Sequence, residues 1–240
     1  MLCEIRSFIG TRKYQEDSAD FCSADGELFC TVCDGIGSRS GGELSSQTAV
    51  RRFVELYKSS DTSDFSAFIL AAAEQIDREV YDLCGEGSGT TAVAVLVRGR
   101  ELYWLSVGDS RLYILRGGEL RQITTDHNYS YVLDLRREKD LIDEETYLAE
   151  QKKGGCLASF IGMGGIDIVD VNFEPLILEP NDRLLLATDG LYRPLPHETI
   201  CGLLSQGTAR EAADRLIDAV KSLDIERDNT TLAIIDLTEE

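Results

Sequence analysis

Four aspartates stand where apolar segments of the sequence end, turn or begin: Asp34, Asp109, Asp189 and Asp228. Acids at the ends of neighbouring strands can converge at one edge of a sheet, and carboxylates that meet there repel one another unless cations neutralise them. Carboxylate oxygens are the ligands that Mg2+ and Mn2+ prefer, and no set of cysteines and histidines favours zinc. The pattern therefore indicates a site for hard divalent cations.

An arginine and two adjacent acids lie in the polar connection between the first two expected strands. Arg12 could receive an anion, while Glu16 or Asp17 could bind metal directly or through water. Two ions beside an arginine could activate a bridging water and neutralise a phosphoryl transition state. These residues favour phosphoryl chemistry.

Each acid taken alone also has a simpler explanation. Asp-Gly is a common turn dipeptide, and it occurs here at Asp34-Gly35 and Asp189-Gly190. An aspartate in a tight turn, such as Asp109, often only hydrogen-bonds the backbone. The adjacent charges near residue 12 could form a solvated turn. The recurrence of the acids is what supports a site.

The elements expected around these residues are strands and amphipathic helices. Apolar residues at three- and four-residue steps predict a helix over about 65–83, and helices are also expected over about 42–57 and 208–223. At the start of the last helix, Thr208 and Glu211 have the spacing of a capping box. Strands are expected over 3–8, 18–24, 90–98, 101–107, 110–116, 167–178 and 232–237. Two further apolar strands are expected over 29–33, ending at Asp34, and over 182–187, before Asp189. The connections at 98–100 and 108–110 are too short for a crossover helix, so neighbouring strands should be antiparallel.

Two polar segments lie between these elements. A glycine-rich loop from Ser38 to Glu43 lacks the lysine of a P-loop. The segment 124–155 is expected to be helical and charged, and His127 at its beginning fits a helix start better than a catalytic role.

Composition limits the kinds of partner and location. With 240 residues and no linker-like stretch, the chain is expected to form a single domain, 1–240. A formal charge of −19 argues against nucleic acid and anionic membranes as partners. No apolar run reaches the length of a membrane span, and no signal peptide precedes the first strand.

The seven cysteines are odd in number and scattered, which does not suggest a disulfide framework. Cys30 and Cys33 should lie on opposite faces of one strand, because their offset is three. Reduced thiols and a cytoplasmic location are expected.

Eight motifs resemble the metal-dependent protein phosphatases of the 2C type, in their compact bacterial form. They are Gly10-x-Arg12-x-x-Gln15-Glu16-Asp17, Asp34-Gly35-Ile36-Gly37 with Gly42-Glu43, Gly87-Ser88-Gly89-Thr90-Thr91, Val107-Gly108-Asp109-Ser110-Arg111, Thr125-Asp126-His127, the segment Leu157 to Gly162, Thr188-Asp189-Gly190-Leu191, and Asp228-Asn229-Thr230-Thr231. Any one motif is weak, but eight in order cover essentially the whole chain.

The resemblance implies an α+β fold, a four-layer αββα sandwich of two mainly antiparallel sheets flanked by helices, with a two-metal site at one edge. Asp34 would bridge both metals, and the Gly35 carbonyl would bind one of them. Asp189 and Asp228 would hold the other ion. Further contributions, partly through water, would come from Asp17 and Glu16.

It also implies roles around the metals. Arg12 would bind the substrate phosphate, and Asp109 with Asp189 would form a weaker third metal site. The region of about 128–155 would be a flap that helps select the substrate. Ile36 stands where many eukaryotic relatives have a histidine proposed as the general acid, so the proton donor to the leaving oxygen is not identified. Ser38 replaces a common glycine, which leaves the path of its loop open.

The implied activity is hydrolysis of phosphoserine and phosphothreonine in proteins by direct attack of a metal-bridging hydroxide. Mn2+ or Mg2+ would serve as cofactor, the substrates would be those of a cognate serine/threonine kinase, and the protein would be a monomer. Two alternatives stay open: a metal-dependent phosphatase of small phosphorylated metabolites, and a silent pseudophosphatase that binds phosphoproteins.

Overall fold

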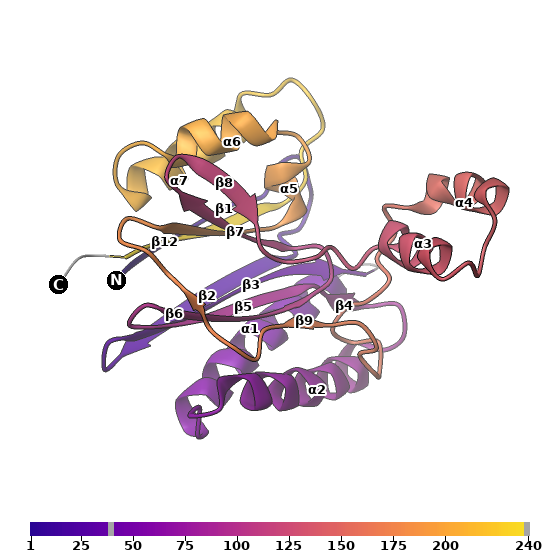
Figure 1. Ribbon diagram of the computed structural model, residues 1–240, viewed down its shortest axis with the longest axis horizontal. Coiled ribbons are helices and arrows are strands. Elements are labelled where there is room, and N and C mark those ends of the chain that lie inside the picture. Colours follow the sequence, from indigo (N-terminus) through magenta and orange to yellow (C-terminus); the bar gives the residue numbers. More distant parts are fainter. Residues whose placement is uncertain (38–40, 238–240) are drawn as a thin grey trace.

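Two antiparallel sheets stacked face to face, with helices on both outer faces, form the body of the molecule (Figure 1). The computed structural model describes residues 1–37 and 41–237. The predicted α+β four-layer sandwich is confirmed. Part of the predicted loop Ser38–Glu43 lies outside the described residues, and so does Ser38 itself.

The first sheet has the strand order β1-β12-β11-β7-β8. Its strands are β1 (Leu2–Phe8), β12 (Thr230–Asp236), β11 (Arg183–Ala187), β7 (Arg111–Arg116) and β8 (Glu119–Gln122). The first and last strands of the chain are therefore neighbours. This pairing brings the segment after β1 beside the segment before β12, which is where Arg12 and Asp228 lie.

The second sheet has the order β10-β6-β5-β3-β2, with the short strands β4 and β9 paired to β3 and β6. Its strands are β2 (Asp17–Ala24), β3 (Glu27–Ile36), β4 (Gly89–Thr90), β5 (Ala92–Arg98), β6 (Glu101–Val107), β9 (Asp170–Val171) and β10 (Leu176–Ile177). The strand signal predicted over 167–178 thus yields only two short strands.

Helices cover the outer face of each sheet. The second sheet is covered by α1 (Gly41–Ser59) and α2 (Phe65–Cys84), and the first by α5 (Asp189–Tyr192), α6 (His197–Leu204) and α7 (Ala209–Lys221). The predicted capping box at the start of α7 is present: Thr208 accepts from the Glu211 backbone, and Glu211 accepts from the Thr208 backbone. This pair satisfies two helix donors that would otherwise lack partners.

Three apolar cores hold the four layers together. One lies between α1, α2 and the second sheet, one between the two sheets, and one between the first sheet and helices α5 to α7. Cys33 belongs to the first core and Cys30 to the core between the sheets, which confirms that they point to opposite faces of β3. All seven cysteines are free thiols.

Two local expectations from the sequence are wrong. β3 does not end at Asp34 but continues to Ile36, because residues 35 and 36 pair with β4. The link 108–110 does not close a hairpin: it carries the chain from β6 in the second sheet to β7 in the first. Asp109 therefore lies in a link between the two sheets, whereas in a hairpin it would have stayed at the end of one sheet.

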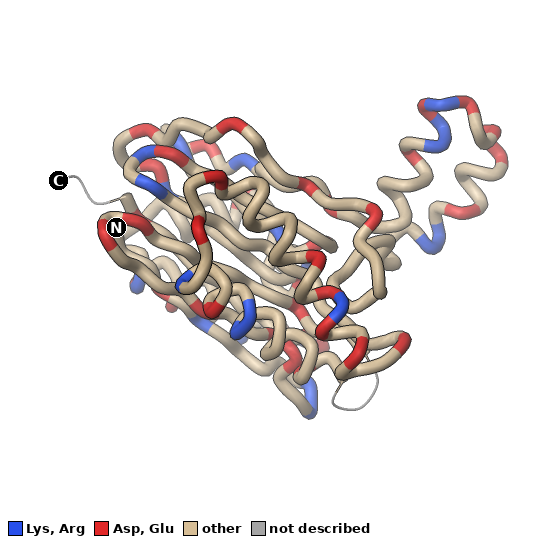
Figure 2. The backbone as a smooth tube through the Cα atoms, turned by 90° about the horizontal axis from the view of Figure 1, so that it is seen from below, with Lys and Arg blue, Asp and Glu red and all other residues tan. Residues whose placement is uncertain are grey.

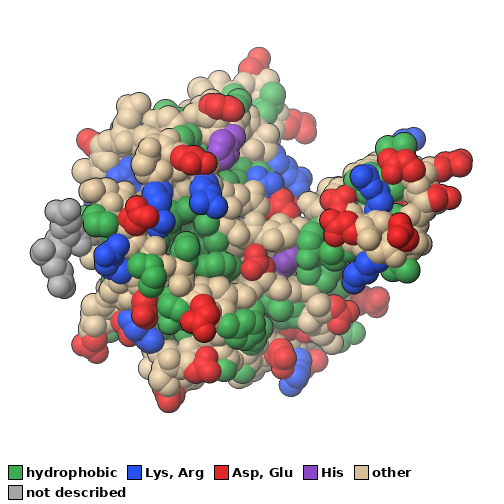
Figure 3. All heavy atoms as spheres, in the orientation of Figure 1, with side chains coloured by type: hydrophobic (Ala, Val, Ile, Leu, Met, Phe, Trp, Pro, Cys, Tyr) green, Lys and Arg blue, Asp and Glu red, His purple; other side chains and the backbone are tan. Residues whose placement is uncertain are grey.

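An arm of two helices, α3 (Tyr129–Glu138) and α4 (Glu144–Glu150), followed by a 3-10 turn (Gln151–Lys153), stands off the body (Figures 1 and 3). Most of the segment 124–155 is thus helical, as predicted. Aspartates and glutamates are spread along the backbone with lysines and arginines interspersed (Figure 2). In the described part of the chain, no helix is both long and apolar enough to cross a membrane.

Candidate functional site

One pocket of about 300 Å3 gathers nearly all the predicted site residues. It is lined by acids from five separate segments: the loop before β2, strand β3, the link between the sheets, the segment that follows β11 and the segment that precedes β12. The predicted residues that line it are Arg12, Glu16, Asp34, Gly35, Asp109, Asp189 and Asp228. The pocket opens at the edge of the sandwich, as the alignment of strand ends predicted.

Asp17 is the one predicted ligand that does not line this pocket; it lies buried opposite Asp34 in the β2–β3 register. Its Oδ2 accepts a hydrogen bond of 2.9 Å from the Thr188 hydroxyl, while its Oδ1 is buried without a partner. Burial raises the pKa of Asp17 to about 7. Like charges directly opposite in a sheet are unfavourable, so this pair requires protonation or a cation.

The same environment acts on the other acids of the pocket. Burial, followed by the charges of Asp17 and Asp189, raises the pKa of Asp34 well above its ordinary value. Burial also raises the pKa of Asp189, to about 6, although the nearby Arg193 opposes the shift. Several carboxylates that resist ionisation together form a place where a cation would bind favourably.

Two guanidinium groups already contact this acidic group. Arg12 donates to Asp228 Oδ2 at 2.5 Å. Arg193 donates to Asp109 Oδ2 at 2.9 Å and lies 3.0 Å from Asp189 Oδ2. Both arginine side chains are 55% exposed, so each reaches from the wall of the pocket toward solvent.

The glycines of the two Asp-Gly pairs are required by close packing. A Cβ at Gly35 would collide with the backbone carbonyls of Gly42 and Glu16. A Cβ at Gly190 would collide in the same way with the carbonyl of Asn229. In both places the glycine lets another segment of the site approach the aspartate before it.

The donor set fits hard divalent cations. Every candidate ligand is a carboxylate or carbonyl oxygen, and the unpartnered Asp17 Oδ1 is a buried acceptor that a cation or its water could satisfy. Within residues 1–37 and 41–237, no three acidic, histidine or cysteine side chains already surround one point. The acids line a common pocket, and arginines contact three of them, Asp109, Asp189 and Asp228.

Three further residues position the site, and the sequence assigned no role to any of them. Asn229 is buried: its Oδ1 accepts from the Glu16 backbone at 2.7 Å, and its Nδ2 donates to the carbonyls of Ile9 and Tyr14. Thr188 connects Asp17 to β12 by accepting from the Thr231 backbone. Arg193 is the third. Arg193 follows Asp189 by four residues, and this spacing could have predicted an ion pair across one helical turn.

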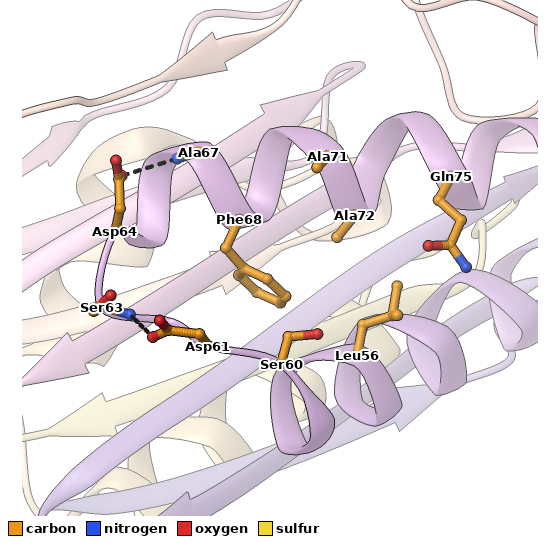
Figure 4. A pocket seen from close by; sticks show the side chains of 10 residues that line it. All are labelled: Leu56, Ser60, Asp61, Ser63, Asp64, Ala67, Phe68, Ala71, Ala72 and Gln75. Carbon is orange, nitrogen blue, oxygen red and sulfur yellow. Dashed lines mark hydrogen bonds between the residues drawn. The ribbon is translucent and has the colours of Figure 1, made fainter.

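One other hollow lacks this chemistry, and another shares part of it. A groove between the end of α1 and the start of α2 is lined by small, apolar and polar side chains, with Asp61 and Asp64 bonded to nearby backbone groups (Figure 4). A larger hollow beside the acidic pocket shares Arg12, Asp189, Arg193 and Asp228 with it. Chemistry on a bound ligand therefore belongs to the acidic pocket.

Residues 6–224 match the family model described as protein phosphatase 2C. The chain belongs to the protein phosphatase 2C family. It is 29% identical to the serine/threonine phosphatase stp of Listeria monocytogenes, over 95% of this chain and 93% of that one.

Solved structures of the family agree in fold. The crystal structure of the Mycobacterium tuberculosis serine/threonine phosphatase PstP/Ppp is 28% identical, with a TM-score of 0.79 and 99% of each chain covered. The catalytic domain of PstP in complex with two manganese ions is also 28% identical, with a TM-score of 0.76, covering 99% of this chain and 98% of that one.

Proposed function

We propose that the chain is a metal-dependent serine/threonine phosphatase that hydrolyses phosphoserine and phosphothreonine in proteins. The observation that carries the proposal is the convergence of the acids and Arg12 in one open pocket at the edge of a 2C-family fold. The relatives named above are serine/threonine phosphatases, which supports the same substrate class.

Two divalent ions, Mn2+ or Mg2+, are the proposed cofactor. Asp34 and the Gly35 carbonyl would hold both ions together with Asp189 and Asp228, while Asp17 and Glu16 support them, Glu16 through water. The two manganese ions of the PstP catalytic domain support this stoichiometry. When bound, such ions supply an activated water and offset the charge that develops on a phosphoryl group.

The chain's own side chains supply the rest of the proposed mechanism. Arg12 is half-exposed at the rim and presents guanidinium donors suited to phosphate oxygens. Its contact with Asp228 fixes it beside the metal ligands. Ile36 lines the pocket and has no proton to give, so another group must protonate the leaving serine or threonine oxygen.

The region around the pocket suggests how a protein substrate would be held. Gly155 and Leu157, at the end of the helical arm, line the same pocket as the acids. We propose that the arm, as the predicted flap of about 128–155, contacts the polypeptide around the phosphorylated residue. A cognate serine/threonine kinase, a monomeric state and a cytoplasmic location stay predictions.

Hydrolysis of p-nitrophenyl phosphate with and without Mn2+ tests the activity. Turnover should require the metal and fall to background in Asp34→Ala; equal turnover of both proteins would contradict the proposal. A panel of phosphoserine and phosphothreonine peptides against sugar and nucleotide phosphates then tests the substrate class. Higher kcat/KM for the small metabolites would favour a metabolite phosphatase.

A further inference from the structure

Arg193 occupies the place between two predicted ligands of a third metal ion. Its guanidinium contacts Asp109 at 2.9 Å and Asp189 at 3.0 Å, through carboxylate oxygens of both residues. The Asp109 side chain is only 6% exposed, and among the described residues Arg193 is the sole cation that forms an ion pair with it. The positive charge that this pair of acids requires is therefore supplied from within the chain.

Neighbouring contacts hold Arg193 in this position. Tyr192 donates its hydroxyl to the Asp109 carbonyl at 2.7 Å, so consecutive residues at the end of α5 grip the backbone and the side chain of Asp109. The Arg111 guanidinium packs over the Tyr192 ring, 3.6 Å from its centroid, and pairs in turn with Asp126. The backbone N–H of Arg193 donates to the Asp189 carbonyl, which keeps both contacts within one helical turn.

We propose that Arg193 serves as a built-in cation at the Asp109–Asp189 pair, so that this phosphatase binds two divalent ions and excludes the third. The inference rests on the proposed two-metal site and concerns how many ions that site takes. It predicts that Arg193 limits the number of divalent ions that this chain binds to two.

The charges in and beneath the pocket are consistent with two ions. The six acids Glu16, Asp17, Asp34, Asp109, Asp189 and Asp228 face two guanidinium groups, those of Arg12 and Arg193. Two divalent ions together with these two arginines carry as many positive charges as the six carboxylates carry negative ones. A third ion would have to displace Arg193 from two acids and lie beside its charge, which Coulomb repulsion disfavours.

Counting bound Mn2+ by equilibrium dialysis tests the inference without relying on turnover. Wild-type protein should bind two ions per chain, and Arg193→Gln should bind a third at least about tenfold more tightly than wild type does. Arg193→Lys keeps the charge and should stay at two. Arg78→Gln, which removes an exposed arginine from α2, is the matched control and should also bind two.

A second measurement keeps the test valid if the variant is less stable. In EDTA, Arg193→Gln should melt at a lower temperature than Arg78→Gln, because Asp109 loses its cation partner. Adding Mn2+ should raise the melting temperature of Arg193→Gln by more than that of Arg78→Gln. Circular dichroism at the dialysis temperature establishes that each protein is folded.

The outcomes separate this inference from the proposed function. Three ions on wild-type protein, or two on both wild type and Arg193→Gln, would overturn the role of Arg193 and leave the two-metal phosphatase intact. A raised KM for p-nitrophenyl phosphate in Arg193→Gln with two ions bound would assign Arg193 to substrate and overturn the inference. Fewer than two ions on wild type would contradict the metal site itself.

Discussion

At the scale of single residues, the site holds buried carboxylates that repel one another. Asp17 and Asp34 face each other across two strands, and burial raises the pKa of both carboxyl groups. Arg12 and Arg193 neutralise acids at the rim but do not pair with Asp17 or Asp34. Removing the charge of Asp17 or Asp34 should therefore stabilise the metal-free protein, because the repulsion between the two carboxylates is lost. The same change should abolish metal binding.

We expect Asp34→Asn to separate stability from activity. Metal-dependent hydrolysis of p-nitrophenyl phosphate should fall to background, because the proposed bridging ligand loses its charge. The free energy of unfolding in EDTA at pH 7.5 should rise by roughly 1 kcal/mol, because a buried like-charge repulsion is removed. Urea denaturation measures this change.

Asp82→Asn, on the exposed face of α2, provides the control for Asp34→Asn. It should change neither the activity nor the unfolding free energy by more than about 0.5 kcal/mol. A loss of stability in Asp34→Asn without metal would show that the carboxylate is not repelled by its neighbours.

Arg12→Lys should act mainly on substrate binding. Lysine keeps the charge but lacks the planar fork of parallel N–H donors, so kcat/KM for a phosphothreonine peptide should fall about tenfold or more, chiefly through KM. Steady-state kinetics measures the split, with Arg51→Lys on the exposed face of α1 as control. An unchanged KM would show that Arg12 does not contact the phosphate.

At the scale of elements, one side chain ties together the segments that carry the site. Asn229, just before β12, makes three hydrogen bonds to the backbone of residues 9–16. Those residues include Arg12 and Glu16, while Asp228 precedes Asn229 directly. The geometry of the arginine and of one proposed metal ligand therefore depends on this amide.

Asn229→Ala should cost about 2–4 kcal/mol of unfolding free energy, since three backbone groups lose their partner, and should also raise KM. Asn172 is a matched control: it too makes three hydrogen bonds to backbone groups, far from the pocket, at the edge of β6. Asn172→Ala should lose comparable stability and keep its KM. Equal effects of both variants on KM would show that Asn229 contributes only stability.

At the scale of the whole molecule, the acids connect stability to pH and metal. Asp17 and Asp189 have pKa values raised to about 7 and about 6 in the fold, above 3.8 for the free side chain. A raised pKa means that the folded state holds the proton more tightly. The stability that protonation contributes is complete below about pH 4 and is lost as pH rises through 6 to 7.

The shift in melting temperature on adding Mn2+ should therefore be larger at pH 8 than at pH 5.5. At the higher pH the metal-free fold bears unneutralised charge, and the carboxylates are free to bind the ion. Differential scanning calorimetry in Mn2+ and in EDTA at each pH measures the shift. Asp17→Asn should flatten the dependence, whereas a shift that falls with pH would contradict the assignment.

The sequence by itself indicated the fold class, the main helices that cover each sheet and the acids that line one pocket. Apolar periodicity and the order of the motifs are properties of the sequence along the chain, so they can be recognised without a structure. They correctly placed Cys30 and Cys33 on opposite faces of β3 and the capping box at α7. They also singled out the acids that line the pocket, Asp109 among them as either a turn residue or a ligand of a third metal.

Only the tertiary structure decided how these residues meet. The link at Asp109 crosses between the sheets, because β7 finds its partner in β11 across the sandwich, and no local signal distinguishes this crossing from a hairpin. The position of Asp17 beneath the pocket likewise depends on contacts between distant segments. So do the hydrogen bonds of Asn229 to the backbone of residues 9–16. Arg193 is the clearest case, because its charge becomes part of the site only once α5 packs against the link that carries Asp109.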